Sequence, residues 1–475
     1  MPPAQYRNIV IMSATAVVTR FAPSPTGELH LGNVRTALFS RLLAMQANGR
    51  FVLRVEDTDA ARTTEAHVAA LQRDLLWLGL EWDEGPGMPG VSGPYRQSER
   101  SDIYAPLLAR LETDDQAYPC FCSSVELELS RRAQLAAGRP PRYAGTCAQL
   151  DAGQRAARFA TGARASLRFR IPAERQLQFD DLVHGTQQVD CAHIGDFVVR
   201  RDEGTPAFFF ANAVDDSLMQ VTHVLRGEDH LANTPRQLLV LEALGLRAPQ
   251  YGHLPLLTGS DGAPLSKRNG AQSVRELREL GYGALAVCNQ LFRLGHSSNE
   301  HGTLTLQDMA AHFELGHLQR ASAHFDTVQL RHWQGLWARS LGSEMAMNWL
   351  EPFLPVGVTN AQRAVCVAAL LPNIVAAGEI TAWLPVVFGG ELQFESEASA
   401  AIASAGTEFF RVTAAAAGEA PDLAVLRSAS GVKGAAFFAP LRAALTGRLH
   451  GPELAPLLKA MAPGLARARL TAWAQ

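Results

Sequence analysis

The stretch Val17-Val-Thr-Arg-Phe21-Ala-Pro-Ser-Pro-Thr-Gly-Glu-Leu-His30-Leu-Gly-Asn33 decides the fold. It opens with a short apolar run of strand length, residues 17–21, and a loop constrained by proline and glycine follows. A helical pattern begins near Gly32 and continues to about Ala47, with its apolar residues on one face. A second strand-length run, Phe51-Val-Leu-Arg-Val55, comes next. Strand, helix and strand at this spacing predict a βαβ unit and therefore a parallel sheet.

His30 and Gly32 stand where the predicted helix begins. A helix start offers unpaired backbone N–H groups and the positive end of the helix dipole, and both suit a phosphate. The His30 imidazole can donate to a phosphate oxygen, and Gly32 lets a nucleotide approach the backbone because it has no side chain. The alternative is an ordinary strand–helix turn with a surface histidine, and a lone His-x-Gly does not decide between them.

Farther along the chain, the pattern changes twice. Helical spacing predicts helices over 64–78 and 104–118, and residues 120–210 then form a basic stretch punctuated by proline and glycine, which reads as an inserted mixed domain. The remaining predicted elements of this part are strand patterns at 166–169, 195–199, 221–226 and 254–257, and a helix at 234–244. After about residue 325, alanine- and leucine-rich segments predict an all-α half, with helices at 361–371, 400–417, 435–445 and 451–461.

Length and composition exclude several classes of protein. The chain has 475 residues, a formal net charge of −3 and 47% hydrophobic residues, which is too long for one core of about 250–300 residues. The 19% of charged residues excludes a wholly disordered chain, and the sequence lacks the long uncharged apolar run of a membrane span. The near-neutral charge does not favour a general polyanion binder. Ten arginines and four acids between Glu126 and Arg175 nevertheless make a local basic patch or a solvated arginine-rich surface.

Three of the six cysteines lie close together, in Cys120-Phe-Cys122 and Tyr143-Ala-Gly-Thr-Cys147. Six cysteines in a chain of this length do not make a disulfide scaffold, so we expect reduced thiols. Tetrahedral zinc needs four ligands, and these thiols supply three. The alternative is a group of half-buried thiols without metal.

Lysine is rare in this chain, since only Lys267, Lys433 and Lys459 accompany forty arginines. A position that keeps lysine is notable because an ammonium is a compact point charge and a guanidinium a planar fork. Lys267 lies in Pro264-Leu-Ser-Lys-Arg-Asn-Gly270. A mobile loop with lysine and arginine can neutralise charge on a phosphate during transfer, although a solvated loop is the alternative.

Together these motifs closely resemble those of bacterial class I glutamyl-tRNA synthetases, including the variant with relaxed or altered tRNA(Gln) specificity. His30-Leu-Gly-Asn33 matches the family's HIGH signature, and Leu265-Ser-Lys-Arg268 matches most of its KMSKS loop. The other matching blocks are Arg20–Leu38, Arg54–Asp59, Gln97–Arg100, Val214–Asp216, Arg226–His230 and Gly431–Gly447. The resemblance runs from about Val17 to about residue 460.

The resemblance implies an enzyme that ligates L-glutamate to tRNA(Glu) with ATP, through a glutamyl-adenylate intermediate and with Mg²⁺ on the phosphates. It implies catalytic roles for His30, Lys267 and Arg268, because attack of an anion on a polyanion needs positioning and charge neutralisation. The implied ATP-binding residues are His30, Gly32, Asn33, Glu228 and Lys267. The implied glutamate-binding residues are Arg20, Ala22, Ser24, Glu56, Phe208, Asn212 and Arg226.

Arginine suits the two carboxylates of glutamate because its fork binds a carboxylate bidentately, and Glu56 would face the ammonium. Without the resemblance, we would interpret residues 54–59 as a surface charge network and Arg226–Glu228 as a structural ion pair.

The resemblance also implies a structural zinc site at Cys120, Cys122 and Cys147, with Tyr143 as the fourth ligand. Some members of the family instead use a ligand two residues after the last cysteine, and Gln149 at that position is a poor one.

Three positions depart from the family pattern. Pro264 and Asn269 replace the first lysine of the signature loop and the histidine that follows it, which bears on ATP affinity. Phe208 replaces a tyrosine, so a hydroxyl near the substrate is missing. We expect an active enzyme, since these departures leave His30 and Lys267 in place.

The implied fold is an α/β Rossmann-like catalytic domain with an α/β insert, followed by an all-α anticodon-binding domain. The predicted divisions are an N-terminal extension (1–16), the catalytic domain (17–119 and 211–258), an acceptor-stem insert (120–210), a stem-contact domain with the signature loop (259–325) and the helical domain (326–475). Met12 is an alternative start to Met1.

Other functions remain open at this point. One alternative is an enzyme that charges tRNA(Gln) with glutamate, alone or in addition to tRNA(Glu). Another is a catalytically inactive tRNA-binding paralogue. The short relative that modifies a tRNA base lacks a helical half, and glutaminyl-tRNA synthetases have β-barrels there, so both fit less well. We expect a cytoplasmic monomer that makes no membrane contact.

Overall fold

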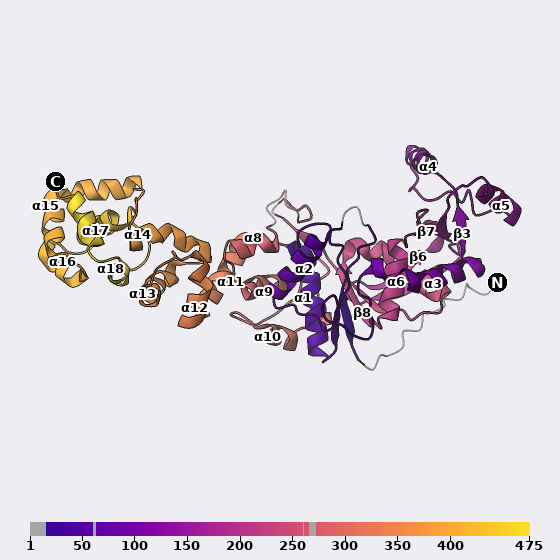
Figure 1. Cartoon of the computed structure of the whole chain (residues 1–475), viewed down its shortest axis with the longest axis horizontal. Helices are drawn as coiled ribbons and strands as arrows, with labels where there is room; N and C mark the ends of the chain where they lie inside the picture. Colours follow the sequence, from indigo (N-terminus) through magenta and orange to yellow (C-terminus); the bar gives the residue numbers. More distant parts are fainter. Residues whose placement is uncertain (1–15, 60–62, 260, 266–271) are drawn as a thin grey trace. The chain divides into compact units, whose positions relative to one another are not determined.

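The computed structural model describes residues 16–59, 63–259, 261–265 and 272–475 (Figure 1). The predicted extension before residue 16 and the alternative start at Met12 therefore lie outside the described residues. The chain divides into two compact units. One takes in the described residues up to Arg275 together with Cys288–Asp326, and the other consists of Glu276–Val287 and Thr327–Gln475.

A six-stranded sheet in the order β2-β1-β8-β9-β5-β6 forms the centre of the first unit. Its strands are β1 (Val18–Phe21), β2 (Arg50–Leu53), β5 (Gln176–Asp181), β6 (Gly185–Asp190), β8 (His223–Gly227) and β9 (Gln250–Leu254). All neighbours pair in parallel except β5 and β6, which form an antiparallel hairpin. Strand order reverses between β1 and β8, which is where doubly wound sheets bind ligands. The predicted Rossmann-like fold is confirmed.

Helices cover this sheet because their apolar residues recur at helical spacing. Helix α1 (Leu31–Gln46) follows β1 and buries Val34, Leu38 and Leu42, as the periodicity predicts. Helix α2 (Glu65–Trp77) starts at Thr64, whose side chain accepts from the backbone N–H of His67. Two further helices of this unit, α6 (Phe208–Leu218) and α7 (Thr234–Ala243), pack against each other.

A second, antiparallel sheet consists of β3 (Ala117–Cys120), β4 (Ser166–Phe169) and β7 (Phe197–Arg200), the last two within the predicted insert. Figure 1 labels the helices α4 (Ser124–Ala136) and α5 (Ala152–Ala160). Both helices begin with capping boxes. The 3-10 turn Gln97–Glu99 precedes α3 (Ser101–Thr113).

The helix predicted over 104–118 is wrong at its end. Helix α3 stops at Thr113, Asp115 adopts a positive φ of 51°, and β3 begins at Ala117. Aspartate tolerates this left-handed conformation, which turns the chain and frees Tyr118 for the strand.

The strand predicted at 254–257 also differs. Strand β9 ends at Leu254 and β10 (Leu257–Thr258) begins a separate pair with β11 (Ala323–His324). Pro255 lies between them, and a proline lacks the N–H that a continuing strand would donate.

The second unit is helical throughout its described part, as the alanine- and leucine-rich segments predict. Its helices are α11 (Thr327–Ser340), α12 (Ser343–Leu350), α13 (Asn360–Leu370), α14 (Leu384–Phe388), α15 (Ser396–Ala416), α16 (Leu423–Ser430), α17 (Ala435–Thr446), α18 (Leu454–Ala460) and α19 (Leu465–Ala472). The buried faces of α12 to α19 share one core, with Phe410, Leu441 and Leu457 among its members.

Residues 274–311 contain three short helices: α8 (Val274–Glu279), α9 (Ala284–Arg293) and α10 (Leu306–Ala311). The stretch predicted as a stem-contact domain, 259–325, is thus shared between the two units, since 276–287 belongs with the helical one. The finer domain boundaries stay predictions.

Within the described ranges, no single helix combines the length and hydropathy of a membrane span. One pair, Asn360–Asn373 and Ala377–Phe388, reaches both together but is bent by 109°.

We predict that Gly447→Ala destabilises the helical unit far more than Gly431→Ala. Both glycines end a helix in the left-handed conformation, at φ values of 75° and 65°. That conformation costs an alanine about 1 kcal/mol at either position. A Cβ at Gly447 would also lie 2.2 Å from the carbonyl oxygen of Gln393, whereas a Cβ at Gly431 meets open space.

The added crowding should cost Gly447→Ala about 1–3 kcal/mol more. Urea unfolding of the full chain, followed by far-ultraviolet circular dichroism, measures both variants. Equal losses for the two alanines would contradict the close packing described here.

Candidate active site

A cavity of about 410 Å³ lies at the carboxyl ends of β1 and β8, where the strand order reverses. Its walls come from the loop between β1 and α1, the start of α6, the end of β8 and the segment after β9. Ten of the predicted site residues line it: Arg20, Ala22, Ser24, His30, Gly32, Asn33, Glu56, Phe208, Asn212 and Arg226. Residues from separate parts of the sequence therefore meet at one place.

The sequence also predicts Glu228, Lys267 and Arg268 for catalysis or ATP binding. Glu228 is not among the lining residues, and its carboxylate accepts from the backbone N–H of Leu256 at 2.9 Å. Lys267 and Arg268 lie outside the described residues. On either side of that segment, the N–H of Leu265 donates to the carbonyl of Leu257 at 2.8 Å, and Ser273 forms a bridge with His30.

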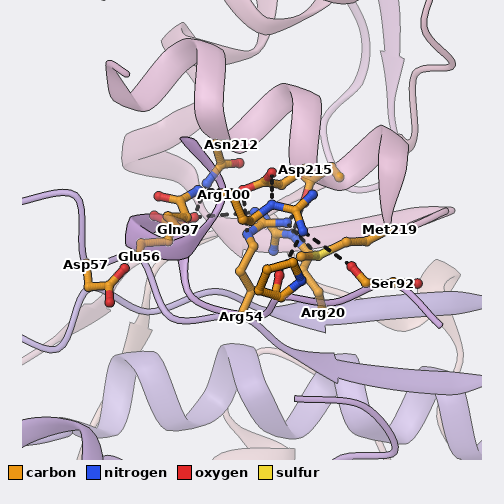
Figure 2. A network of polar contacts seen from close by, with 12 residues as sticks. Arg20, Arg54, Glu56, Asp57, Ser92, Gln97, Arg100, Asn212, Asp215 and Met219 are labelled. Atoms are coloured by element: carbon orange, nitrogen blue, oxygen red, sulfur yellow. Dashed lines mark hydrogen bonds and ion pairs between the residues drawn. The ribbon is translucent and has the colours of Figure 1, made fainter. Parts of the chain in front are cut away.

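A buried network of arginines and carboxylates supports the floor of the cavity (Figure 2). Its centre is Arg54, which is fully shielded from solvent. The guanidinium donates to Asp216 at 2.7 Å and to Glu56 at 3.4 Å, and its Nε lies 3.8 Å from Asp215. Arg54 is thus not part of a surface charge network, because Glu56 and two carboxylates of α6 surround it in the interior.

The same network fixes the position of Arg20. Asp216 accepts from Nε of Arg20 at 3.1 Å, on the same oxygen that binds Arg54. A second donor group of Arg20 reaches the carbonyl of Leu225 on the neighbouring strand β8, at 3.3 Å. Arg20 is therefore held between α6 and β8 while it lines the cavity.

Asp215 carries the network to the other side of Arg54. It accepts from Gln97 at 2.9 Å and from Nε of Arg100 at 2.7 Å (Figure 2). It also accepts from the hydroxyl of Tyr104 at 2.7 Å. The Gln97–Arg100 and Val214–Asp216 blocks that the sequence singled out therefore act together, as supports for Arg54.

Burial and charge shift the pKa values of these groups in opposite directions. Burial alone would lower the pKa of Arg54, but Asp216, Asp215 and Glu56 more than offset it and raise the value. Burial raises the pKa of Glu56 to about 7, even though Arg54 and Arg20 act against this shift. Asn212 donates to the same Glu56 carboxylate and accepts from Gln237 at 3.2 Å. A positive group in the cavity would complete the surroundings of Glu56.

Arg226 has a different environment from Arg20 and Arg54. Its Nε donates to the ring nitrogen Nε2 of His253 at 3.1 Å, and its NH2 group donates to Thr234 at 2.8 Å. Burial lowers the pKa of Arg226 to about 10. The structural ion pair considered for Arg226 and Glu228 is wrong, because Glu228 binds the Leu256 amide instead.

His30 is the N-cap residue of α1 and faces the cavity. Its backbone carbonyl accepts from the N–H of Val34 at 3.1 Å, which is the first turn of the helix. Burial lowers the pKa of the His30 imidazole, and Asp229 opposes that shift. A neutral imidazole beside the unpaired N–H groups of a helix start can donate to an anion without carrying full charge.

The three cysteines and Tyr143 come together in the insert. The sulfurs of Cys120, Cys122 and Cys147 lie within 4.8 Å of one another. The Tyr143 hydroxyl is 3.4 Å from the Cys120 sulfur and 3.5 Å from the Cys122 sulfur, and the Cys122 and Cys147 sulfurs are 3.6 Å apart. Arg168 donates to the Cys120 sulfur at 3.1 Å and lies over the Tyr143 ring.

Comparison with known proteins gives the same family as the sequence motifs, over most of the chain. Residues 16–332 match the family described as tRNA synthetases class I (E and Q), catalytic domain. The chain belongs to this family. Glutamate–tRNA ligase 2 of Alkalilimnicola ehrlichii is 53% identical over 467 residues, which cover 97% of this chain and 98% of that protein. Glutamate–tRNA ligase 2 of Nitrosococcus oceani is 50% identical over 463 residues, or 96% and 98% of the two chains.

Solved structures of class I synthetases also match over the full length. The crystal structure of glutamate–tRNA synthetase from Elizabethkingia anophelis has a TM-score of 0.85 at 27% identity and covers 97% of this chain and 99% of that chain. A glutamate–tRNA ligase from Elizabethkingia meningosepticum, solved in complex with its amino acid, has a TM-score of 0.84 at 26% identity. That comparison covers 96% of this chain and 99% of the other.

Sequence reasoning missed several residues that line the cavity in this synthetase. Asp229 and His230 lie within a block that was recognised, but no role was expected for them. Arg35 lies one helical turn beyond His30 and donates to the carbonyls of Leu294, at 3.1 Å, and Pro255. An arginine on the buried face of the first helix was the available signal, because a buried charge needs partners.

We predict that Arg54→Met destabilises this synthetase by about 3–5 kcal/mol, because it leaves Asp216 and its neighbours as buried charges without their central cation. Thermal unfolding measures the loss. Arg96→Met is the control, since Arg96 pairs with the exposed Glu65 at 2.5 and 2.7 Å and its loss should change the melting temperature little. Equal shifts for the two variants would show that the buried network is not a central support.

Proposed function

We propose that the chain is an ATP-dependent glutamate–tRNA ligase. In the first step, an oxygen of the glutamate α-carboxylate attacks the α-phosphorus of ATP, and pyrophosphate leaves as glutamyl-adenylate forms. In the second, a ribose hydroxyl of the terminal adenosine of tRNA(Glu) attacks the glutamyl carbonyl, and AMP leaves. The observation that carries the proposal is the meeting of Arg20, Arg226, Glu56 and His30 in one cavity at the strand switch.

The amino-acid half of the cavity fits a molecule with two carboxylates and one ammonium. Arg20 and Arg226 supply guanidinium groups for carboxylates, and Glu56 supplies the acceptor for the ammonium. A bound ammonium would also keep Glu56 ionised, since it offsets the burial that raises the pKa to about 7. Asn212 orients the Glu56 carboxylate, which supports its assignment to the same subsite.

Three other predicted residues complete this half. Ser24 offers a hydroxyl from the loop after β1, and Ala22 leaves room beside it. Phe208 presents an apolar ring at the cavity wall and packs 5.6 Å from the His230 ring. Because phenylalanine replaces the family's tyrosine here, the side chain contributes an aromatic ring to the cavity wall but no hydroxyl.

The nucleotide half lies at the start of α1. His30, Gly32 and Asn33 line the cavity there, so the triphosphate would meet backbone N–H groups and the positive end of the helix. Lys267 and Arg268 supply further positive charge in our proposal, and Glu228 holds the Leu256 backbone at the wall. When bound, Mg²⁺ would neutralise charge on the phosphate oxygens.

Pro264 fits its place despite departing from the family pattern. It forms a bridge with Thr258, and the turn between them closes with a hydrogen bond of 2.9 Å from Gly259 to Ala263. Pro264, which replaces the family's lysine, is therefore compatible with the extended backbone at this position.

For the nucleic acid, we propose that the basic insert meets the acceptor end and that the helical unit meets the anticodon. Single-stranded bases are read by stacking and by hydrogen bonds to their edges, which helical surfaces with arginine can provide. Charging of tRNA(Gln), alone or together with tRNA(Glu), is the second candidate. We further propose a monomer that works in the cytoplasm, where aminoacyl-tRNA is consumed.

We predict glutamate-dependent exchange of pyrophosphate with ATP in the presence of tRNA, and a loss of at least about 100-fold in Lys267→Ala because charge on the reacting phosphate is no longer neutralised. Lys459→Ala, an exposed lysine of α18, is the matched control and should keep full exchange.

Charging of purified tRNA(Glu) and tRNA(Gln) by the wild-type chain then separates the candidates. Charging of tRNA(Glu) alone supports the main proposal, and charging of tRNA(Gln) supports the second. A folded chain that glutamylates neither tRNA would refute both and leave the inactive paralogue.

We also propose that Cys120, Cys122, Cys147 and Tyr143 hold a structural zinc ion. Zinc bonds of about 2.3 Å to sulfur and 2.0 Å to oxygen place tetrahedral ligand atoms about 3.5–3.8 Å apart. The sulfur–sulfur distance of 3.6 Å and the hydroxyl–sulfur distances of 3.4 and 3.5 Å fit this arrangement. The backbone N–H of Phe121, which points at the Cys147 sulfur at 3.4 Å, supports a thiolate there.

We predict one zinc ion per chain by elemental analysis, and none in Cys122→Ser. Tyr143→Phe should weaken retention of zinc against a chelator by about tenfold or more, because a ligand is lost. Cys366→Ser, in the helical unit, is the control and should keep the metal. Zinc retention that is unchanged in Tyr143→Phe but lost in a Gln149 variant would reassign the fourth ligand.

A further inference from the structure

Arg226 is a buried arginine that lines the cavity and is held by neutral groups. Arg20 is paired with Asp216, and Arg54 is surrounded by carboxylates. Among the described residues, no carboxylate forms an ion pair with Arg226, although only 5% of the residue is exposed. Its NH1 group has no hydrogen-bond partner, and the residue lines the cavity. A buried cation in this state is suited to bind an anion.

The groups that do bind Arg226 are neutral acceptors. His253 Nε2 accepts from Nε at 3.1 Å, and Thr234 accepts from NH2 at 2.8 Å while it also contacts His253 Nε2 at 3.0 Å. Both are fully buried. They fix two of the three guanidinium nitrogens without cancelling the charge, so NH1 remains for a ligand.

His253 accepts from Arg226 only if its own proton lies on the other ring nitrogen. Asp181, at the end of β5, ensures this, because its Oδ2 lies 2.5 Å from Nδ1 of His253 and a carboxylate can only accept. The other oxygen, Oδ1, accepts from the backbone N–H groups of Val183 at 2.9 Å, His184 at 2.8 Å and His253 at 3.3 Å. The carboxylate is therefore fixed in both position and direction.

We propose that Asp181 and His253 are positioning residues, which hold Arg226 with its charge and its NH1 group available for a carboxylate of the amino-acid substrate. This inference rests on the proposed function, since it takes glutamate as the substrate. The alternative is a buried histidine that only satisfies its neighbours. Such a histidine would affect stability without changing the affinity for one substrate selectively.

Two substitutions of His253 separate these roles, because an asparagine amide takes the place of Nδ1 and a glutamine amide reaches the place of Nε2. His253→Asn removes the acceptor for Arg226 and should raise the KM for glutamate at least about tenfold, with the KM for ATP changed by less than about twofold. His253→Gln restores an acceptor and should recover most of the loss.

Asp181→Asn tests the same chain of contacts with almost no change in shape. The three backbone donors require an oxygen at the Oδ1 position, so the new amide must point its NH2 group at His253 Nδ1. The histidine proton then moves to Nε2, which faces the Nε–H of Arg226 and can no longer accept from it. We expect the KM for glutamate to rise as in His253→Asn.

The control is His296→Asn, a buried histidine whose Nε2 accepts from the backbone N–H of Glu314 at 3.1 Å. It should lower the melting temperature and leave the KM for glutamate unchanged. If His253→Asn does not fold, Asp181→Asn decides alone. Wild-type affinity for glutamate in the folded variants, or equal rises in KM for ATP and glutamate, would overturn the inference. Absence of glutamate-dependent activity in the wild-type chain would instead refute the proposed function itself.

Discussion

A guanidinium buried beside carboxylates, that of Arg54, is the interaction on which the cavity depends. Arg54 is fully buried, and such a charge is tolerated only with partners. Because Asp216 binds both Arg54 and Arg20, the same carboxylate that stabilises the interior also orients a residue of the cavity wall. Stability of the sheet and geometry of the site are therefore coupled through one helix, α6.

Two of the arginines that line the cavity, Arg20 and Arg226, differ in a way that suits an acidic ligand. Arg20 is held by the carboxylate of Asp216, so it already has a negative partner within the protein. Arg226 is held by a histidine and a threonine, so a ligand carboxylate would be its first negative partner. Burial raises the pKa of Glu56 to about 7, so its ionised form is favoured by a positive group in the ligand. Charges placed this way favour a ligand with both signs.

Local sequence predicted the parts of the site that lie in one segment. The glycine- and proline-bounded loop and the periodicity after it located His30, Gly32 and Asn33 correctly at the start of a helix. Arg54 and its partners were harder, because hydropathy places an arginine at the surface. Its burial is decided by Asp216, 162 residues away. Only the resemblance to a family indicated that these distant blocks belong together.

The support of Arg226 had no signal in the sequence, and the reason is topological. His253 lies 72 residues from Asp181, and they meet only because β5 adds to the sheet beside β9, with Asp181 opposite Tyr251. Strand β5 belongs to the stretch between the two halves of the sheet. That stretch is thus not merely appended to the catalytic fold. Until β5 has paired with β9, His253 lacks the carboxylate that fixes its proton, and Arg226 lacks a directed acceptor. The strand pairing that completes this side of the sheet therefore also brings Asp181 to His253.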